Sequence, residues 1–436
     1  MAYRYDSDLE FLRYMTDKDL EVLVETLTGK YGDRRWTESL TGNDRYKRHY
    51  PNHSKYVDEI MEELQCFGGN TLMNYARLGK GVLYKEILCD VCDKMKVNYN
   101  KKSSVERIEG NLLEKILEKA MENMSEEELK KFAKEVGLDN AKGFSEQTIF
   151  ATMQTAIKAG GFASYQIAVI VANAVAKQVL GRGLTLAANA GLTRAMSVFA
   201  GPIGWIGWIA GPAYRVTILA VVEVIVLRQR LNSAVDIFLT GESGVGKDTI
   251  YHILKDGKFG KWDNTNKLFK DKFDSLGRML RVINTAGHHD NDNENIEARR
   301  DLPCGTRYVY VFNAYDYFTN AEIKKQVNLD IGNHKDLCEK NQWNLKIIGT
   351  HKDICLKQCI NKSNIPKNKI DALKQWIFKI IGTHKDICLE HSISDDEIQK
   401  LVSEFGGESK CQILDLTIYN DSQKQENLYN FIVGKE

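Results

Sequence analysis

Residues 235–249 read VDIFLTGESGVGKDT, and this stretch decides the fold expected for the second half of the chain. The apolar run at 235–240 predicts a buried strand, and the glycine-rich stretch predicts a loop leading into a helix near Lys247. In such a loop the glycines let successive backbone N–H groups turn inward around an anion, and the helix N-terminus adds its positive pole. The stretch therefore predicts a phosphate-binding loop (P-loop) for a nucleoside triphosphate.

The residues after the glycines carry the expected chemistry. Lys247 is placed to reach the β- and γ-phosphates as a point charge. Asp248 stands where a magnesium-binding Ser or Thr is usual, and Thr249 follows it, so both are candidate Mg²⁺ ligands. The alternative is a glycine-rich turn that binds no ligand. The candidate nucleotide-binding residues of the loop are Gly241, Glu242, Ser243, Gly244, Val245, Gly246, Lys247, Asp248 and Thr249.

A second loop follows the predicted strand 279–283. The run from Asn284 to His288 resembles the γ-phosphate loop of Ras-like and translational GTPases, which reads Asp-x-x-Gly followed by Gln or His. The resemblance implies that Gly287 donates a backbone N–H to the γ-phosphate and that His288 orients the attacking water. Asn284 replaces the aspartate and is a weaker partner for Mg²⁺. The alternative is an exposed histidine pair in an acidic loop.

A third loop follows the strand predicted at 345–349. Its residues Thr350, His351 and Asp353 resemble the base-reading Asn-Lys-x-Asp motif of GTPases, in the Thr-His-x-Asp form of Roc-type GTPases. The resemblance implies that Asp353 accepts hydrogen bonds from guanine, while Thr350 and His351 position the loop and flank the ring. Thr265 lies where the family has its switch threonine, although a plain Asn-Thr turn fits equally well.

The order of these segments predicts a doubly wound parallel sheet with its loops at the carboxyl ends of the strands. Residues 233–436 are therefore expected to form a P-loop GTPase-like domain that binds GTP or GDP with Mg²⁺. This domain contains an internal repeat, in which residues 342–356 recur at 375–389. One domain needs one base-reading loop, so Asp353 or Asp386 is the working residue. Asp353 is favoured because its copy stands at the right distance after the preceding strand.

Residues 1–232 predict an all-helical domain. Thr16 caps a predicted helix, and apolar residues recur at helical spacing from Leu112 to Met121. An apolar, Gly/Ala-rich helical hairpin is expected at about 160–228, within which residues 195–214 hold no charged side chain. Such a hairpin is buried in a soluble bundle, engages a membrane surface or a protein partner, or forms a permanent transmembrane helix.

This helical half resembles the bacterial YaaW-like proteins, which carry an uncharacterised label or one that likens them to ubiquinol-cytochrome c chaperones. The resemblance covers residues 2–232 and is carried by residues 5–12, 64–70, 81–88 and 213–218. It implies an interaction or assembly role and brings no catalytic residues.

Composition limits the partners and the cellular location that can be expected. The 436 residues include 60 basic and 59 acidic side chains, a formal net charge of +1, so no bulk attraction to nucleic acid is implied. Nine cysteines are spread along the chain and no leader-like segment opens it, so a reduced cytoplasmic protein is expected, peripheral at the inner membrane if the hairpin engages lipid. A homo-oligomer is left open.

Three functions follow. The first is a GTP-binding switch, with GTPase activity, whose nucleotide state changes the helical domain. The second is a chaperone-like or assembly protein whose nucleotide domain hydrolyses weakly, because Asp248 and Asn284 alter the magnesium site. The third is a P-loop kinase, for which Arg299 and Arg300 are the only candidate lid arginines.

Overall fold

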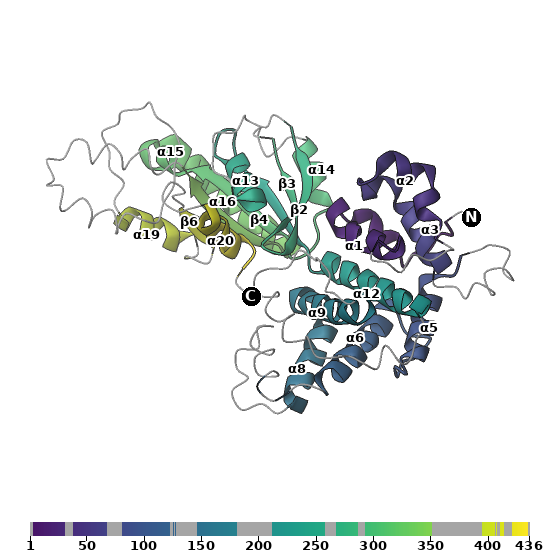
Figure 1. Cartoon of the computed structure of the whole chain (residues 1–436). Helices are drawn as coiled ribbons and strands as arrows, with labels where there is room; N and C mark the ends of the chain where they lie inside the picture. Colours follow the sequence, from purple (N-terminus) through teal and green to yellow (C-terminus); the bar gives the residue numbers. More distant parts are fainter. Residues whose placement is uncertain are drawn as a thin grey trace, which may run out of the picture. The chain divides into compact units, whose positions relative to one another are not determined.

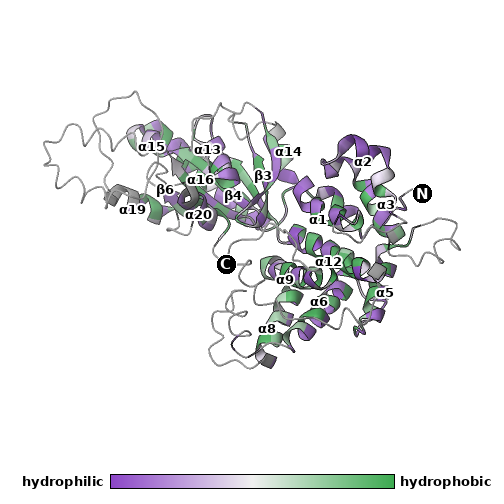
Figure 2. Cartoon of the chain, viewed as in Figure 1, coloured by the Kyte–Doolittle hydropathy of each residue, from purple (hydrophilic) through white to green (hydrophobic). Residues whose placement is uncertain are grey.

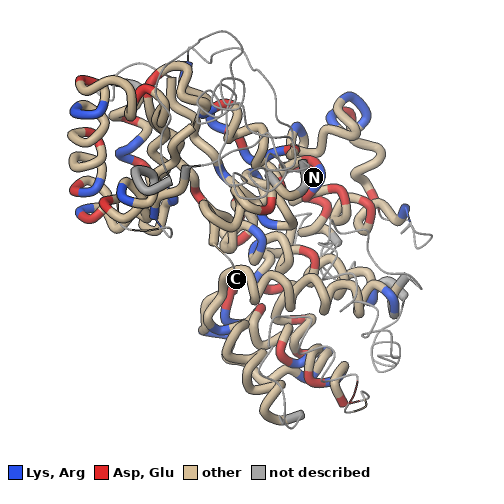
Figure 3. Tube along the Cα trace, turned by 90° about the vertical axis from the view of Figure 1, so that its left-hand side faces the viewer, with Lys and Arg blue, Asp and Glu red and all other residues tan. Residues whose placement is uncertain are grey.

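The structure is a computed structural model that describes residues 3–30, 38–67, 81–122, 125, 127, 146–180, 212–257, 267–286, 293–350, 395–405, 407, 410–413 and 421–434. The chain divides into two compact units, Met1–Ala234 and Val235–Glu436 (Figure 1). The regular structure described in the first unit is helical, whereas the second combines helices with a mixed sheet. Both signs of charge occur along the traced helices in Figure 3, in keeping with the net charge of +1.

The helical unit begins with the capped helix that the sequence predicts. The Thr16 hydroxyl accepts a hydrogen bond from the backbone N–H of Asp19 at 3.2 Å, and the Asp19 carboxylate accepts one from the Thr16 N–H at 3.0 Å. Its helices are η1 (Glu10–Tyr14), α1 (Asp17–Leu27), η2 (Leu40–Gly42), α2 (Asp44–His49), η3 (His53–Tyr56), α3 (Val57–Phe67), α5 (Tyr84–Lys94), α6 (Val105–Met121), α8 (Glu146–Ala159), α9 (Gly161–Leu180) and α12 (Pro212–Asn232).

Helices α9 and α12 form the centre of this unit. The hydrophobic stretch of α9 stands out in Figure 2, and α9 packs along α12, which also contacts α1, α5 and η1. Side chains such as Ile170, Leu219 and Ile225 are completely buried. The described parts of the predicted 160–228 hairpin are thus core helices, and its residues 181–211 lie outside the described ranges.

The second unit alternates strands and helices, as the sequence predicts. Its strands are β1 (Val235–Thr240), β2 (Phe269–Ser275), β3 (Arg278–Asn284), β4 (Arg307–Asn313), β5 (Asn344–Thr350) and β6 (Cys411–Ile413). Its helices are α13 (Lys247–Asp256), α14 (Asn293–Arg300), α15 (Ala314–Thr319), α16 (Ala321–Asn341), α19 (Asp395–Glu404) and α20 (Asp421–Ile432).

The described strands form one sheet in the order β2-β3-β1-β4-β5-β6. The pairs β1–β3, β1–β4, β4–β5 and β5–β6 are parallel, with Phe238 opposite Ile283 on one side of β1 and Tyr308 on the other. The chain therefore leaves β1 toward β3 and later returns to place β4 on the opposite side. This reversal makes the carboxyl end of β1 the switch point of the sheet.

One strand corrects the expectation of a fully parallel sheet. Strand β2 pairs antiparallel with β3 at the edge of the sheet, from Phe269↔Asn284 to Ser275↔Arg278. Leu276 and Gly277 join the two strands, both at positive φ (49° and 84°), as a two-residue hairpin turn requires. The sequence FKDKFDS concealed this strand because an edge strand keeps many charged side chains.

Helices cover both faces of the sheet. On one face, residues of α13 and α20 such as Ile253 and Ile432 pack on Leu239 and Val311. On the other face, α14 and α16 pack on Phe238 and Tyr308, and α15, α16 and α19 pack on Tyr310 and Phe312. Alternate side chains of β1 and β4 serve opposite faces, which is why these strands read as continuous apolar runs.

Candidate functional site

The candidate site in the second unit is the loop 241–246, which connects the carboxyl end of the central strand β1 to helix α13. Gly241 lies at φ 140°, Gly244 at φ 77° and Gly246 at φ 95°. A Cβ added to Gly241 would lie 2.1 Å from the Val311 carbonyl oxygen, so only glycine fits beside β4 at this point. Gly246 is the left-handed N-cap of α13, and it turns the backbone into the first helical turn.

Lys247 folds back over this loop. Its Nζ donates hydrogen bonds to the carbonyl oxygens of Gly241 and Glu242, each at 2.7 Å, and only 6% of its surface is exposed. A buried ammonium is tolerated where fixed acceptors surround it. The loop therefore carries a positive charge next to the backbone N–H groups at the N-terminus of α13, an arrangement suited to an anion.

Asp248 lies on the first turn of α13 and contacts the end of β3. The side-chain Nδ2 of Asn284 donates a hydrogen bond to Asp248 Oδ1 at 2.6 Å, and Asn284 is completely buried. The other amide atom, Asn284 Oδ1, has no hydrogen-bond partner among the described residues. Asp248 and Asn284, two of the three candidate magnesium ligands, thus lie next to each other although they come from different segments.

Thr350, the last residue of β5, joins the third predicted loop to the first. Its hydroxyl donates to the carbonyl oxygens of Val245 at 2.6 Å and Phe312 at 3.0 Å. Its methyl group lies 3.5 Å from the position that a Cβ on Gly246 would take. Strand β5 belongs to the first copy of the internal repeat, residues 342–356, whereas the second copy, residues 375–389, lies outside the described residues.

Other predicted site residues lie outside the described residues. The candidate catalytic residues Thr265 and His288 are among them, as are Gly287, His351, Asp353 and Asp386. Just before Gly287, the backbone N–H of Thr285 donates to the Leu239 carbonyl at 3.1 Å, which holds the start of that loop against β1. The candidate lid residue Arg299 bonds instead to the Asn295 carbonyl in its own helix, at 3.1 Å.

The helical unit contains a second polar feature, which sequence reasoning missed. The Arg228 guanidinium on α12 lies 3.0 Å from the Glu109 carboxylate on α6, and the Tyr84 hydroxyl donates to Glu109 at 2.8 Å. Arg228 also donates to the Asp8 carbonyl at 2.6 Å. Burial raises the pKa of Glu109 to about 7, while the neighbouring Arg228 charge opposes the rise. The sequence signal that could have indicated this contact is the presence of charged residues such as Arg228 in the otherwise apolar helix α12.

Further polar contacts lie along α12 on either side of Arg228. Thr26 on α1 donates to the Glu223 carboxylate at 2.7 Å, and both side chains are buried. Burial raises the pKa of Glu223 well above its ordinary value. Arg230 lies 2.6 Å from the Asp19 carboxylate. These contacts fix how α12 sits against α1 and α6, and they offer no arrangement of nucleophile and base.

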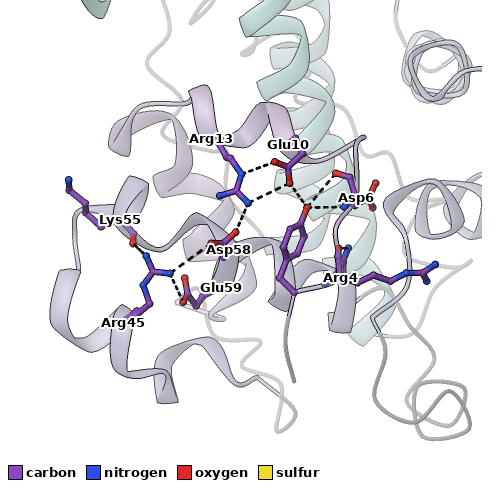
Figure 4. A network of polar contacts seen from close by, with 10 residues as sticks. Arg4, Asp6, Glu10, Arg13, Arg45, Lys55, Asp58 and Glu59 are labelled. Atoms are coloured by element: carbon purple, nitrogen blue, oxygen red, sulfur yellow. Dashed lines mark hydrogen bonds and ion pairs between the residues drawn. The ribbon is translucent and has the colours of Figure 1, made fainter.

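An exposed polar network ties the first residues of the chain to α2 and α3 (Figure 4). Arg13 donates to Glu10 at 2.8 Å and to Asp58 at 2.5 Å, while Arg45 donates to Glu59 at 3.1 Å. Exposed ion pairs of this kind contribute little free energy each. The network is therefore a surface connection between helices.

Comparison with known proteins places the helical unit in a family. A family model described as ubiquinol-cytochrome C chaperone matches residues 52–208, and one described as a domain of unknown function (DUF3944) matches residues 3–36. A UPF0174 protein of Helicobacter pylori strain J99 is 52% identical over 242 residues, which cover 54% of this chain and 95% of that relative. The chain belongs to the UPF0174 family.

Further UPF0174 proteins are similar to the chain over about half of its length. One from Helicobacter pylori strain 26695 is 43% identical over 207 residues, covering 45% of this chain and 99% of the relative. The UPF0174 protein YaaW of Escherichia coli K12 is 32% identical over 242 residues, which cover 53% of this chain and 97% of that relative. The family matches therefore suggest a chaperone-like UPF0174 protein, and both matched family models lie within residues 3–208.

The described helices can be compared with the length and hydropathy that a membrane span needs, whereas residues 195–211 of the uncharged stretch lie outside the described residues. No single helix in the described ranges is both long and apolar enough to cross a membrane. The segments Gln147–Ala159 and Gly161–Lys177, bent by 116° relative to each other, reach the required length and composition only as a pair.

Proposed function

We propose that this UPF0174 protein is a chaperone-like or assembly protein whose second unit binds a nucleoside triphosphate and hydrolyses it slowly. The observation that carries the nucleotide part is the geometry of the 241–247 loop. Three glycines at positive φ bend its backbone, and Lys247 is held over it by two carbonyl oxygens. Backbone N–H groups, a helix N-terminus and a fixed ammonium together suit the β- and γ-phosphates.

The position of the loop in the sheet supports the same proposal. In open sheets with helices on both faces, ligands bind outside the carboxyl ends of the strands, at the point where the strand order reverses. Here β1 is flanked by β3 and β4, and the glycine loop begins at its carboxyl end. A phosphate group in this loop would lie at the switch point.

Guanine is the base we propose. Thr350 hydrogen-bonds to the Val245 carbonyl, so the strand that precedes His351 and Asp353 is attached to the phosphate loop. Asp353 follows Thr350 by three residues, and we propose that it accepts hydrogen bonds from the base of a nucleotide in that loop. This contact favours the GTPase-like interpretation over the kinase.

Mg²⁺ is the cofactor we propose for the same site. A hard cation bound to a nucleotide takes one or two protein oxygens beside phosphate oxygens and waters, and when bound it would neutralise phosphate charge. Asp248 and Asn284 fit that requirement, since a carboxylate adjoins a buried amide whose oxygen has no partner among the described residues. Thr249 remains the alternative ligand. Thr265 as switch threonine and His288 as water-orienting residue complete the proposed site.

The helical unit is the proposed partner-binding part. It carries the match to a family model described as a ubiquinol-cytochrome C chaperone, and we propose a protein partner for it. Only Ser233 and Ala234 separate α12 from β1, so the core helix of one unit leads directly into the strand that precedes the glycine loop. Partner binding that changes with nucleotide state is the behaviour we expect.

Binding of a fluorescently labelled GTP to the full chain tests the nucleotide part, with Lys247→Met as the key variant. Loss of a charge-assisted contact should weaken binding about tenfold to a hundredfold. Lys255→Met, at the opposite end of α13, is the matched control and should bind like the unmodified chain. Equal affinity of Lys247→Met and the unmodified chain would overturn the assignment of the loop.

Suppression of aggregation tests the chaperone-like part. The full chain, added in equal amount to a heat-unfolded model protein, should reduce light scattering, and addition of GTP with Mg²⁺ should alter that effect. A chain that leaves scattering unchanged in every nucleotide state would refute this part and leave nucleotide binding to be judged separately.

A further inference from the structure

Asp248 and Asn284 exchange the chemical types that their positions usually hold. In P-loop nucleotide-binding proteins a neutral Ser or Thr follows the loop lysine, and an aspartate at a neighbouring strand end completes the magnesium site. Here the carboxylate is on the first turn of α13 and the neutral amide is at the end of β3. The pair keeps one negative charge in total but moves it next to the phosphate loop.

The contact between Asp248 and Asn284 is fixed by burial and by a hydrogen bond. Asn284 is completely buried and donates to Asp248 Oδ1 at 2.6 Å, which fixes the carboxylate at the start of α13. Asn284 Oδ1 is left without a partner among the described residues, although buried polar atoms are nearly always satisfied. An oxygen-binding cation at this position would satisfy it.

Among the described residues, Asp248 and Asn284 supply fewer oxygen ligands than a divalent cation usually takes. The described part of the chain contains no group of three or more His, Cys, Asp or Glu side chains able to hold a metal ion. In the proposed site, a cation at Asp248 and Asn284 takes phosphate oxygens of a nucleotide to complete its coordination shell. Cation and nucleotide should bind together.

The charge of Asp248 has the opposite effect when no cation is present. The carboxylate follows Lys247 directly and shares the positive field at the N-terminus of α13 with any bound phosphate. The carboxylate and the phosphate are both negative and repel each other, and partial burial of Asp248 limits screening of this repulsion by solvent. Free nucleotide should therefore be rejected, whereas a neutral Ser or Thr would accept it.

We propose that Asp248 makes the divalent cation an obligatory part of the ligand, so that the loop binds the metal–nucleotide complex and excludes the free nucleotide. This inference rests on the proposed nucleotide binding and names its regulation. The availability of Mg²⁺ then controls occupancy of the site, because the same carboxylate binds the cation of the complex and repels the free triphosphate.

The test measures the affinity of the full chain for GTP in Mg²⁺ and in EDTA, with Asp248→Ser and Asp248→Asn as variants. The unmodified chain should bind in Mg²⁺ and lose at least about tenfold in affinity in EDTA. Both variants should gain affinity in EDTA and show a smaller difference between the two conditions. Asp248→Asn keeps the shape of the side chain and serves if the serine variant folds poorly.

Asp256→Ser is the matched control, since Asp256 ends the same helix on the side away from the loop. It should retain the full dependence on Mg²⁺. Equal binding of the unmodified chain in Mg²⁺ and EDTA, or no gain in EDTA for either Asp248 variant, would overturn the inference while nucleotide binding stands. Absence of GTP binding by every protein in both conditions would instead refute the proposed function.

Discussion

The hydroxyl of Thr350 at the end of β5 donates a 2.6 Å hydrogen bond to the carbonyl oxygen of Val245 in the glycine loop. This contact joins two segments that are far apart in sequence, and Thr350 bonds to Phe312 of β4 as well. The loop after β1 is therefore held in place by contacts that involve β4 and β5, the next two strands of the sheet. Its shape depends on the sheet as a whole.

Replacing Thr350 tests the importance of this support. Thr350→Val keeps the shape of the side chain but removes the donor, and it should lower the free energy of unfolding by about 1–3 kcal/mol because the Val245 carbonyl loses its partner. Thr350→Ser keeps the hydroxyl and should recover most of the loss. Thermal denaturation measures both, and a valine variant as stable as the unmodified chain would contradict the role given to Thr350.

Glycine at position 241 is required by space. Gly241→Ala places a Cβ at 2.1 Å from the Val311 carbonyl, so the backbone must move and unfolding should become easier by more than about 3 kcal/mol. Gly244→Ala meets no atom within 4 Å and should cost only the backbone strain of positive φ, about 1–2 kcal/mol. Chemical denaturation measures the free energy of unfolding of both variants. An equal decrease in the two would show that crowding against β4 plays no part.

The buried carboxyl of Glu223 predicts a pH dependence of stability. Its folded-state pKa is raised by burial, so its contribution is fully present below the unfolded value near 4.5 and is lost as pH rises through the folded value. Glu223→Gln keeps an oxygen acceptor for Thr26 and should raise the melting temperature at pH 8 while changing it little at pH 4.5. The exposed Glu21→Gln is the control on α1. No rise at pH 8 would contradict the burial argument.

The ion pair between Arg228 and Glu109 should be costly to break. Arg228→Met leaves the Glu109 carboxylate buried with one partner, Tyr84, and should lower the free energy of unfolding by about 3–5 kcal/mol at pH 8. The double variant Arg228→Met/Glu109→Leu should regain part of that loss, since no uncompensated charge remains. Denaturant titration of a double-mutant cycle measures the coupling, and strict additivity would refute it.

Local sequence patterns account for much of the sheet unit. The strands β1, β3, β4 and β5 follow from apolar runs, because strands covered on both faces need apolar side chains at successive positions. Helix α16, from Ala321 to Asn341, begins after Asn320, whose side chain caps it as an asparagine commonly does. Strand β2 escaped prediction because its charged residues give no comparable signal.

The contacts at the candidate site depend on packing between distant segments. The glycine pattern indicates a loop, but nothing local to Asn284 shows that its amide reaches Asp248. The partners of Arg228 and Glu223 likewise come from helices more than a hundred residues away in sequence, so only the assembled bundle pairs them. The sequence therefore predicts which residues are chemically notable, and the fold decides which of them meet.

Calorimetric titration of the full chain with GTP, GDP and ATP in the presence of Mg²⁺ tests the central claim most directly. The loop geometry and the Thr350 contact predict one saturable site that binds guanine nucleotides more tightly than ATP. Binding of ATP alone would contradict the guanine assignment. Absence of binding by all three nucleotides would contradict the nucleotide-binding role of the second unit altogether.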